Sequence, residues 1–416
     1  MENNIQVDDA PRPWGIYVHI PFCRQKCYYC DFASWAGREH YMTDYTAALL
    51  QELYRRGARY AARWGRPATM YIGGGTPTAL PREQLLAIVT ALQGVGAAGK
   101  TAALTPCRAG AADGHASGPQ GLSSDLPLEF TVEANPGTVD EAYLAALRRA
   151  GVNRLSFGVQ SFDDRLLRRI GRIHTAAQAR ASFAAARAAG FDNISLDLMY
   201  GLPGQTLSDL QSSVEQALAL GPEHISIYGL QLEPGTVFAR QQEQGRLELP
   251  DDDTAEAMYD YMTTALPQAG YERYEISNFA RPGRESRHNM SYWQDVPYLG
   301  IGAAAHSYLD GQRYENMADI AGYIKAVTEG ESVTSEEEPA TRQIAMEEYA
   351  FLALRMVRGI SRDGFAARFG VTLESVYGEV IARLEAQGLL QTTPEAVALT
   401  PQGMKLGNQV FAEFLL

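Results

Sequence analysis

The chain has 416 residues, of which 46% are hydrophobic and 20% charged, and its formal net charge at pH 7 is -13. This length suffices for one barrel-sized domain with a smaller companion and a large buried core. The negative charge argues against general attraction to nucleic acid, and no run of about 20 apolar residues indicates a transmembrane segment.

The N-terminal residues, MENNIQVDDAPRPWG, are acidic and contain proline. They lack the basic patch and apolar stretch of a secretory signal, so we expect residues 1–13 to form a tail and the protein to be cytoplasmic. Three of the four cysteines lie within eight positions of one another. In a reducing compartment such a cluster indicates a metal-binding or catalytic site rather than a disulfide framework.

Short apolar runs alternate with helical patterns over the first 250 residues. The predicted strands cover residues 15–20, 69–74, 128–134, 154–160, 193–201 and 224–231. The helical patterns between them cover residues 44–57, 81–94, 140–151, 177–190 and 207–221, and each closes on the glycine typical of a helix end. This alternation predicts an α/β fold with a parallel sheet, either doubly wound or curled into a full or partial barrel. In either architecture ligands bind at the C-terminal ends of the strands.

One segment interrupts this alternation. Residues 94–127 are rich in Ala, Gly, Ser and Pro, and they lie where a connection normally takes about 2 to 6 residues. We expect a flexible surface insertion there. It contains Cys107 and His115, but a flexible loop makes a poor metal cage, so we do not expect these two residues to be metal ligands.

The pattern changes again near residue 340. Three predicted helices, at residues 345–359, 361–370 and 373–388, precede a predicted hairpin at residues 389–403, which is the outline of a winged-helix unit. The helix that would enter a DNA groove carries three glutamates and one arginine. We therefore expect this unit to serve in packing or protein contact rather than in nucleic-acid binding.

The clustered cysteines are Cys23, Cys27 and Cys30, which form a C-x3-C-x2-C motif directly after the first predicted strand. Thiolates delivered from one short loop are typical of iron-sulfur clusters, and three of them leave one iron of a [4Fe-4S] cluster open. Zinc is the alternative. Structural zinc usually has four protein ligands, whereas only three cysteines are grouped here and His19 lies on the preceding strand.

A glycine run follows the second predicted strand, in the sequence YIGGGTPT at residues 71–78. Without Cβ atoms, such a run exposes backbone groups to a ligand at close range. Taken alone it is equally consistent with a tight turn.

Together, the cysteine motif and the glycine run resemble the radical-SAM superfamily. The resemblance implies a [4Fe-4S] cluster on the three cysteines, with S-adenosylmethionine on the open iron. The sequence GGGTPT and the motifs VEANPG, SFGVQS, RIGRIHT and DLMYGLPGQT are similar to the branch of this superfamily that includes the coproporphyrinogen oxidases. By this resemblance, the residues lining the cluster-bound S-adenosylmethionine are Tyr17, Tyr29, Gly75 and Glu133. The residues holding a second molecule of it are Thr76, Gln160, Arg172, Asp197 and Gly229. Their alternative interpretation is strand-end capping and ion pairing.

Two features separate the functions within this branch. Oxygen-independent coproporphyrinogen III oxidases typically have a fourth cysteine where this chain has Phe32, whereas HemW-type haem chaperones typically read CDF, as here. The segment His288-Asn289-x-x-Tyr292-Trp293 resembles the HNxxYW motif of the HemW-type group. Imidazole can ligate haem iron and aromatic rings can pack on the macrocycle, so His288, Tyr292 and Trp293 are haem candidates.

A histidine with local hydrogen bonds beside two core aromatic residues is the other interpretation of this segment. His306, in YLGIGAAAHSY, is a weaker candidate for haem or substrate contact. We expect structural roles for His174 and His19.

The resemblance extends from about residue 14 to the C-terminus. It implies a partial (β/α)6 radical-SAM barrel over residues 14–250, an extension with the HNxxYW segment over residues 251–339, and a C-terminal helical, winged-helix-like domain over residues 340–416 that covers the barrel mouth.

The predicted function is a haem chaperone that passes haem to an unknown acceptor protein, with a reductant protein as a further partner and no catalytic residue assigned. Two alternatives remain at this point. One is an oxygen-independent coproporphyrinogen III oxidase, and the other is a zinc-stabilised winged-helix binding protein.

Overall fold

The computed structural model describes residues 12–97, 128–335 and 340–415. Most of the N-terminal tail and of the insertion expected at residues 94–127, with Cys107 and His115, therefore lies outside the described residues. None of the described helices is long and apolar enough to cross a membrane.

Most strands of the described residues belong to one curved sheet of eleven strands, in the order β11-β10-β9-β1-β2-β3-β4-β5-β6-β8-β7. Their bounds are β1 (Gly15–Ile20), β2 (Thr69–Gly74), β3 (Glu129–Ala134), β4 (Arg154–Gln160), β5 (Ile194–Tyr200), β6 (His224–Gly229), β7 (Glu272–Arg273), β8 (Asn278–Ala280), β9 (Tyr298–Ile301), β10 (His306–Leu309) and β11 (Gln312–Glu315). Strands β9 and β1 to β6 are parallel, and an antiparallel pair extends each edge.

The six predicted strands are confirmed, because β1 to β6 form in chain order as neighbours in one parallel sheet. Their inward and outward faces are both covered, which explains why they appear in the sequence as apolar runs rather than as strict alternation. The fold is therefore the predicted α/β partial barrel. The sequence did not reveal β9, which pairs in parallel with β1 and brings residues 298–301 beside the start of the chain.

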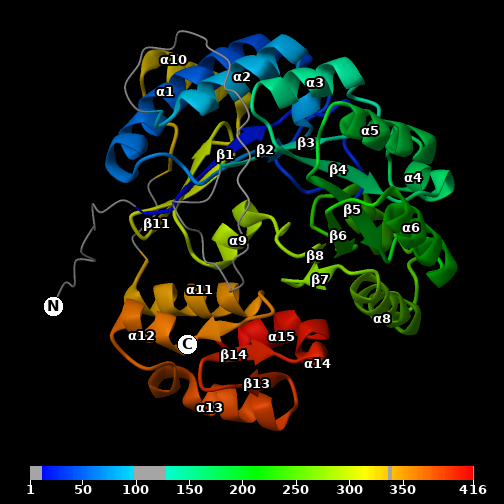
Figure 1. The fold of residues 1–416 in the computed structure, drawn as a ribbon, viewed down its shortest axis with the longest axis vertical. Helices are drawn as coiled ribbons and strands as arrows, with labels where there is room; N and C mark the ends of the chain where they lie inside the picture. The colour runs from blue at the N-terminus through cyan, green and yellow to red at the C-terminus, as the bar shows by residue number, and fades with distance from the viewer. Residues whose placement is uncertain (1–11, 98–127, 336–339, 416) are drawn as a thin grey trace.

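Helices follow most strands of the barrel. Those of the barrel and its extension are α1 (Met42–Trp64), α2 (Arg82–Gly94), α3 (Glu141–Arg149), α4 (Asp164–Arg169), α5 (Ala176–Ala188), α6 (Leu207–Leu220), α7 (Val237–Glu243), α8 (Asp252–Gln268), α9 (Arg287–Trp293) and α10 (Ile320–Glu329), with 3-10 turns at Glu39–Tyr41 and Pro77–Ala79. Figure 1 shows α1 to α6 around the outside of the curved sheet, whereas α9 lies on its inner side.

Capping explains where several of these helices begin and end. Capping boxes start α5 at Thr175 and α6 at Thr206, and each satisfies backbone N–H groups of the first turn. Helix α6 ends at Gly221, whose φ of 67° is the left-handed conformation that glycine adopts without strain. The closing glycine is the signal used in the sequence analysis, and the capping boxes are an addition from the structure.

The C-terminal unit has its own hydrophobic core. It consists of α11 (Arg342–Leu354), α12 (Arg362–Phe369), α13 (Leu373–Ala386), α14 (Pro401–Lys405), α15 (Gly407–Ala412) and a small sheet of β12 (Ile360–Ser361), β14 (Ala396–Leu399) and β13 (Leu390–Thr392). The three predicted helices and the predicted hairpin are confirmed, and β12 adds a third strand to the hairpin.

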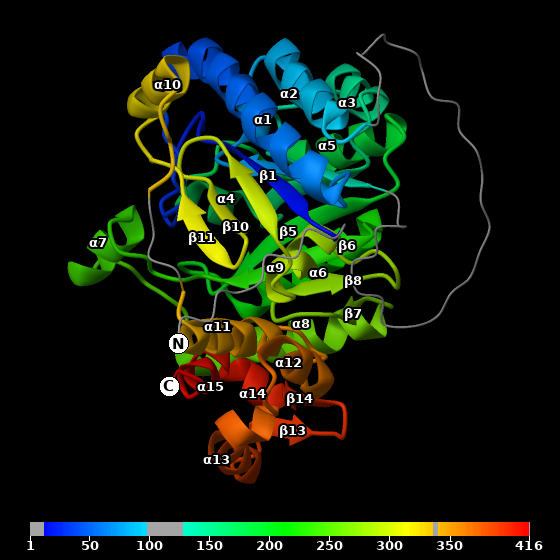
Figure 2. The same ribbon diagram turned by 90° about the vertical axis from the view of Figure 1, so that its left-hand side faces the viewer.

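The C-terminal unit contacts the barrel through several elements. Its contacts with the barrel come from α9 and from both edges of the large sheet, as Arg313 of β11 pairs with Glu348 and Glu275 forms a β-bridge with Met356. Figure 2 shows the unit below the barrel, next to α8 and β7. That the unit covers the barrel mouth stays a prediction.

Candidate functional site

The cysteine loop begins two residues after β1 and is tied down at both ends. The backbone N–H of Cys23 donates to the carbonyl of Trp35 (3.0 Å), and the N–H of Thr76 donates to the carbonyl of Phe22 (2.8 Å). The three cysteines of the loop are free thiols and partly exposed. The chain thus presents three sulfur atoms on a short segment whose ends are fixed to β1 and to the loop after β2.

The glycine run is required by the packing of these two loops. A Cβ atom on Gly75 would lie 2.8 Å from the carbonyl oxygen of Phe22 and 3.1 Å from the sulfur of Cys23. Gly74 has a φ of 108°, and a Cβ there would meet the ring of His19 at 2.6 Å. Glycine is therefore needed so that the backbone after β2 can lie directly against the first cysteine.

Polar groups surround the thiols. Burial raises the pKa of the Cys23 and Cys30 thiols, and the hydroxyl of Thr76, 3.6 Å from the Cys23 sulfur, lowers that of Cys23. The guanidinium of Arg172 donates to the sulfur of Cys27 over 3.6 Å. A charged hydrogen-bond donor thus lies beside the second sulfur of the motif.

A compact single-ion site is absent from the described residues. No three His, Cys, Asp or Glu side chains in this part of the chain are grouped so that they could hold one metal ion.

Arg172 is the centre of a hydrogen-bonded chain that joins three strand ends. Its Nη2 donates to Oδ1 of Asn135 (2.6 Å) and to the carbonyl of Gly158, and Nδ2 of Asn135 donates to the hydroxyl of Thr76 (2.8 Å). Thr76 and Arg172, both predicted from the sequence, are thus brought together beside Cys27. The sequence analysis missed Asn135, although it lies in the VEANPG motif directly after β3.

Glu133 lies at the end of β3 against the glycine run. Its carboxylate accepts hydrogen bonds from the hydroxyl of Tyr71 (2.6 Å) and the backbone N–H of Gly74 (3.2 Å). Burial raises its pKa to about 7. Tyr17, on the neighbouring strand, stacks on Tyr71 with ring centroids 6.1 Å apart. The glycine run is therefore held in place by a buried carboxyl group.

The remaining predicted residues also lie at or near strand ends. Burial raises the pKa of Asp197, whose carboxylate accepts hydrogen bonds from the hydroxyls of Ser156 (3.1 Å) and Ser195 (3.3 Å). Gln160 has a φ of 66°, a left-handed conformation that is uncommon outside glycine. Gly229 ends β6, and Tyr29 lies in the cysteine loop beside Cys27 and Arg172. Gln160, Asp197 and Gly229 do not touch the thiols through any hydrogen bond of the described residues.

The HNxxYW segment lies at the other end of the strands. His288 is 1% exposed, and its backbone N–H donates to Glu129 at the start of β3 (2.9 Å). Its Nδ1 is hydrogen-bonded with the hydroxyl of Thr69 at the start of β2 (2.8 Å), and its Nε2 with the hydroxyl of Tyr292 (2.9 Å). Burial lowers the pKa of His288 to about 3, so the ring is neutral.

Both ring nitrogens of His288 are therefore engaged within the protein. The ring stacks on Tyr71 with centroids 5.0 Å apart. Trp293, at the end of the same helix, is covered by the guanidinium of Arg355 at 4.4 Å. This geometry corresponds to the interpretation of a locally hydrogen-bonded histidine beside core aromatic residues, and iron coordination by His288 would first require one of its hydrogen bonds to break.

Two adjoining cavities open at the lateral side of the barrel. The inner one has a volume of about 390 Å³ and extends past Tyr17 and Glu133 to Phe32 of the cysteine loop. The outer one has a volume of about 300 Å³ and reaches Leu352 of α11. Tyr292, Tyr298 and His306 line both. These volumes fall within the range of small-molecule sites.

Known proteins match the chain along nearly its whole length. The Radical SAM superfamily matches residues 17–217, and the HemN C-terminal domain matches residues 340–406. Curated relatives include the heme chaperone HemW of Bacillus subtilis, at 41% identity over 96% of this chain and 98% of the relative. The HemW proteins of Lactococcus lactis and Escherichia coli are 38% and 34% identical, and each alignment covers 97% of this chain and 98% of the relative.

Among solved structures, the chain is similar to the coproporphyrinogen III oxidase HemN from Escherichia coli, described as a radical SAM enzyme. The TM-score is 0.80 at 23% identity, over 99% of this chain and 92% of the other. At this identity the likeness shows a common fold, including the C-terminal unit.

Proposed function

Because the chain belongs to the HemW family of radical-SAM proteins, we propose that it is a haem chaperone, which binds haem and passes it to an acceptor protein. The observation that carries this proposal is the 41% identity to a heme chaperone over 96% of the chain. Phe32 supports it, since this residue stands where coproporphyrinogen oxidases typically have a fourth cysteine.

Membership of the radical-SAM superfamily implies a [4Fe-4S] cluster and S-adenosylmethionine. The residues present fit a cluster, because Cys23, Cys27 and Cys30 are free thiols on one anchored loop. These three cysteines are proposed to hold it. When bound, the cluster supplies one-electron chemistry to S-adenosylmethionine.

The residues around the thiols have proposed roles of their own. Arg172 orients the Cys27 sulfur through their 3.6 Å contact. Glu133 fixes the glycine run, so that the backbone of Gly75 faces the cofactor without a side chain between them. Tyr17, Gly75 and Glu133 then line S-adenosylmethionine together with Tyr29, and Thr76, Gln160, Arg172, Asp197 and Gly229 are the proposed contacts of a second molecule.

The oxidase alternative rests on the fold alone, because the similarity to HemN is 23% in identity. Incubation of the reconstituted protein with coproporphyrinogen III, S-adenosylmethionine and a reductant distinguishes the two functions. Decarboxylated product at rates of an oxidase would favour the enzyme over the chaperone. The zinc-stabilised alternative has no support, since the radical-SAM family match includes all three cysteines.

The direct test of the chaperone is haem binding and release by the full chain. Protein reconstituted anaerobically is titrated with haemin, and a saturable Soret band is expected. The loaded protein is then mixed with apomyoglobin, whose haem-bound spectrum should appear while that of the chaperone declines. A specific acceptor and a reductant protein remain proposed partners, to be identified by capture with the loaded protein.

A further inference from the structure

The histidines of the described residues fall into two groups. His19, His174, His224 and His288 are buried, and each has at least one ring nitrogen within hydrogen-bonding distance of a protein oxygen. The rings of His40 and His306 are the exposed ones in this part of the chain. His40 lies on the 3-10 turn after the cysteine loop, away from the two lateral cavities. His306 lies on both.

His306 begins strand β10, and its side chain is 60% exposed. The carboxylate near its ring is that of Glu315, directly opposite on β11, and the distance from Nε2 to Oε1 is 3.8 Å. This contact is longer than a hydrogen bond, so a ring nitrogen of His306 is accessible to a ligand without any buried partner being lost. In this respect His306 differs from His288, both of whose ring nitrogens are engaged by buried protein groups.

The walls of the two cavities are suited to a flat aromatic ligand. Tyr292 and Tyr298 form the wall common to both cavities, with ring centroids 4.6 Å apart in an edge-to-face arrangement. Phe32 lies at the cysteine-loop end of the inner cavity and is 63% exposed. An aromatic ring this exposed on an otherwise anchored loop gains apolar contact when a large planar ligand covers it.

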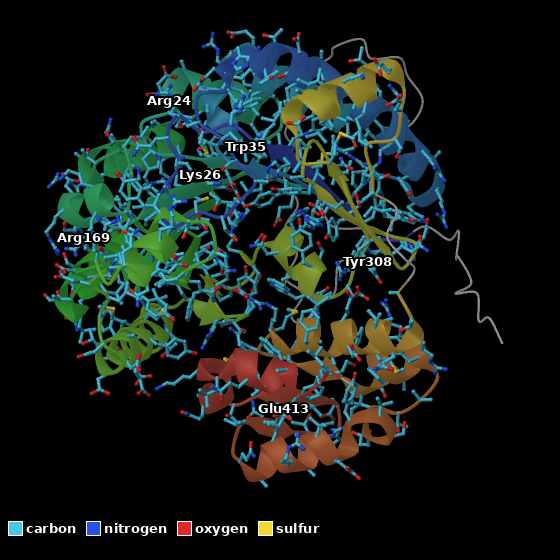
Figure 3. The ribbon with its side chains drawn as sticks, turned by 180° about the vertical axis from the view of Figure 1, so that it is seen from behind. Arg24, Lys26, Trp35, Arg169, Tyr308 and Glu413 are labelled. Atoms are coloured by element: carbon cyan, nitrogen blue, oxygen red, sulfur yellow. The ribbon has the colours of Figure 1, made fainter. Side chains whose placement is uncertain are left out.

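The outer cavity contains one guanidinium, that of Arg313, and one carboxylate, that of Asp295, which is paired with Arg368. The guanidinium of Arg313 lies 4.9 Å from the centroid of Tyr308. The Nε of Arg313 donates to Glu348 (2.9 Å), and the guanidinium also interacts with Tyr298. Its five N–H donors exceed these two contacts, so a propionate could share it. Figure 3 shows Tyr308 near the junction of the barrel and the C-terminal unit, with Trp35 of the cysteine-loop region above it.

That the ligand of these cavities is haem rests on the proposed function. We propose that haem binds in the outer cavity and in the Phe32 and His306 part of the inner one, beside the S-adenosylmethionine site at Tyr17 and Glu133. His306 is the protein ligand of its iron, Phe32 and Tyr298 lie against the porphyrin, and Arg313 lies near a propionate. His288 is then a positioning residue, which fixes the Tyr292 wall through the hydrogen bond to its hydroxyl. Haem in this position extends from the radical-SAM centre to the C-terminal unit.

The proposal is tested on the cluster-reconstituted full chain with haemin as the probe. We compare wild type, His306→Gln and His40→Gln by Soret titration and by electron paramagnetic resonance of the ferric haem. His306→Gln should raise the Kd for haemin about tenfold and remove the signature of imidazole ligation, because iron loses its protein nitrogen. His40→Gln, a matched exposed histidine, should bind as wild type does.

Two further variants keep the result interpretable. His306→Gly should recover the imidazole signature when imidazole is added, which a merely structural role would not produce. Phe32→Ala should weaken haemin binding and leave the signature unchanged. Cluster absorption reports folding of every variant.

The outcomes separate the two proposals. If wild type binds no haemin, the chaperone function fails and the ligand assignment with it. If wild type binds and His306→Gln retains the same affinity and signature, the chaperone stands and the assignment of His306 is overturned. The assignment of His306 would also be overturned if a His288 variant that retains His306 lost the signature of imidazole ligation.

Discussion

The Nε2 of His288 lies 2.9 Å from the phenolic oxygen of Tyr292, one helical turn further along α9. The histidine and the tyrosine of the HNxxYW motif, which the sequence assigns to haem contact, are thus hydrogen-bonded to each other. Its histidine is buried at the starts of β2 and β3, whereas its tyrosine faces the cavities. The hydrogen-bonded pair therefore links the starts of β2 and β3 to the proposed haem site.

Replacing Tyr292 with Phe should destabilise the fold. The change leaves the buried Nε2 of His288 without its partner, which costs about 1 to 3 kcal/mol. Urea denaturation measures the loss. Tyr54→Phe is the control, since Tyr54 is 69% exposed on α1 and should leave the free energy of unfolding unchanged. Equal stability of both variants would mean that the hydrogen bond is not maintained in solution.

Arg172→Lys should reduce cluster retention about tenfold, even though the positive charge is kept. Lysine cannot reproduce the planar fork with which Arg172 contacts Cys27, Asn135 and Gly158 together. Iron and sulfide content after gel filtration measures this. Arg168→Lys, at an exposed position nearby on α4, should retain a normal content. A normal content in Arg172→Lys would show that charge alone is sufficient.

Gly75→Ala should lower both bound iron and binding of S-adenosylmethionine. The added methyl group meets backbone at Phe22 and the sulfur of Cys23, so the two loops must separate. Iron analysis and equilibrium dialysis measure the two losses. Gly94→Ala should change neither, because its methyl group meets no atom within 4 Å among the described residues. Normal binding by Gly75→Ala would contradict the close packing of the loops.

Glu133 should make the fold less stable as the pH rises from about 4.5 to about 7. Burial raises its folded-state pKa to about 7, above the unfolded value of 4.5, so the folded state holds the proton over this range. Its contribution to stability is present below pH 4.5 and is lost as the pH rises through 7, with a slope of at most about 1.4 kcal/mol per pH unit. Glu133→Gln should remove this contribution. An unchanged difference in unfolding free energy between pH 5 and pH 7 would contradict the raised pKa.

The strands and helices of the barrel could be predicted because each is encoded by residues close together in the sequence. Strands β1 to β6 are apolar runs of 6 or 7 residues, and α5 and α6 carry their own caps. The short strands β7 to β11 could not, since they are formed by pairing with distant residues, as when β9 joins β1. A strand of two to four residues has no periodicity to detect.

The site divides in the same way. The three cysteines and the glycine run were predictable from spacing and residue type. The role of Asn135 was not, because it depends on contacts with Thr76 and Arg172 across 59 and 37 positions of sequence. Nor could the sequence show that His288 is buried and His306 exposed, since burial is set by the packing of α9 against the sheet.

We propose above that this radical-SAM barrel carries haem as cargo. The most direct measurement is the visible spectrum of the anaerobically reconstituted protein during titration with haemin and subsequent addition of apomyoglobin. A haem chaperone should develop a saturable Soret band on top of the cluster absorption and then transfer the haem to apomyoglobin. A protein that retains its cluster but develops no Soret band, and instead decarboxylates coproporphyrinogen III with S-adenosylmethionine and a reductant, would contradict the proposal.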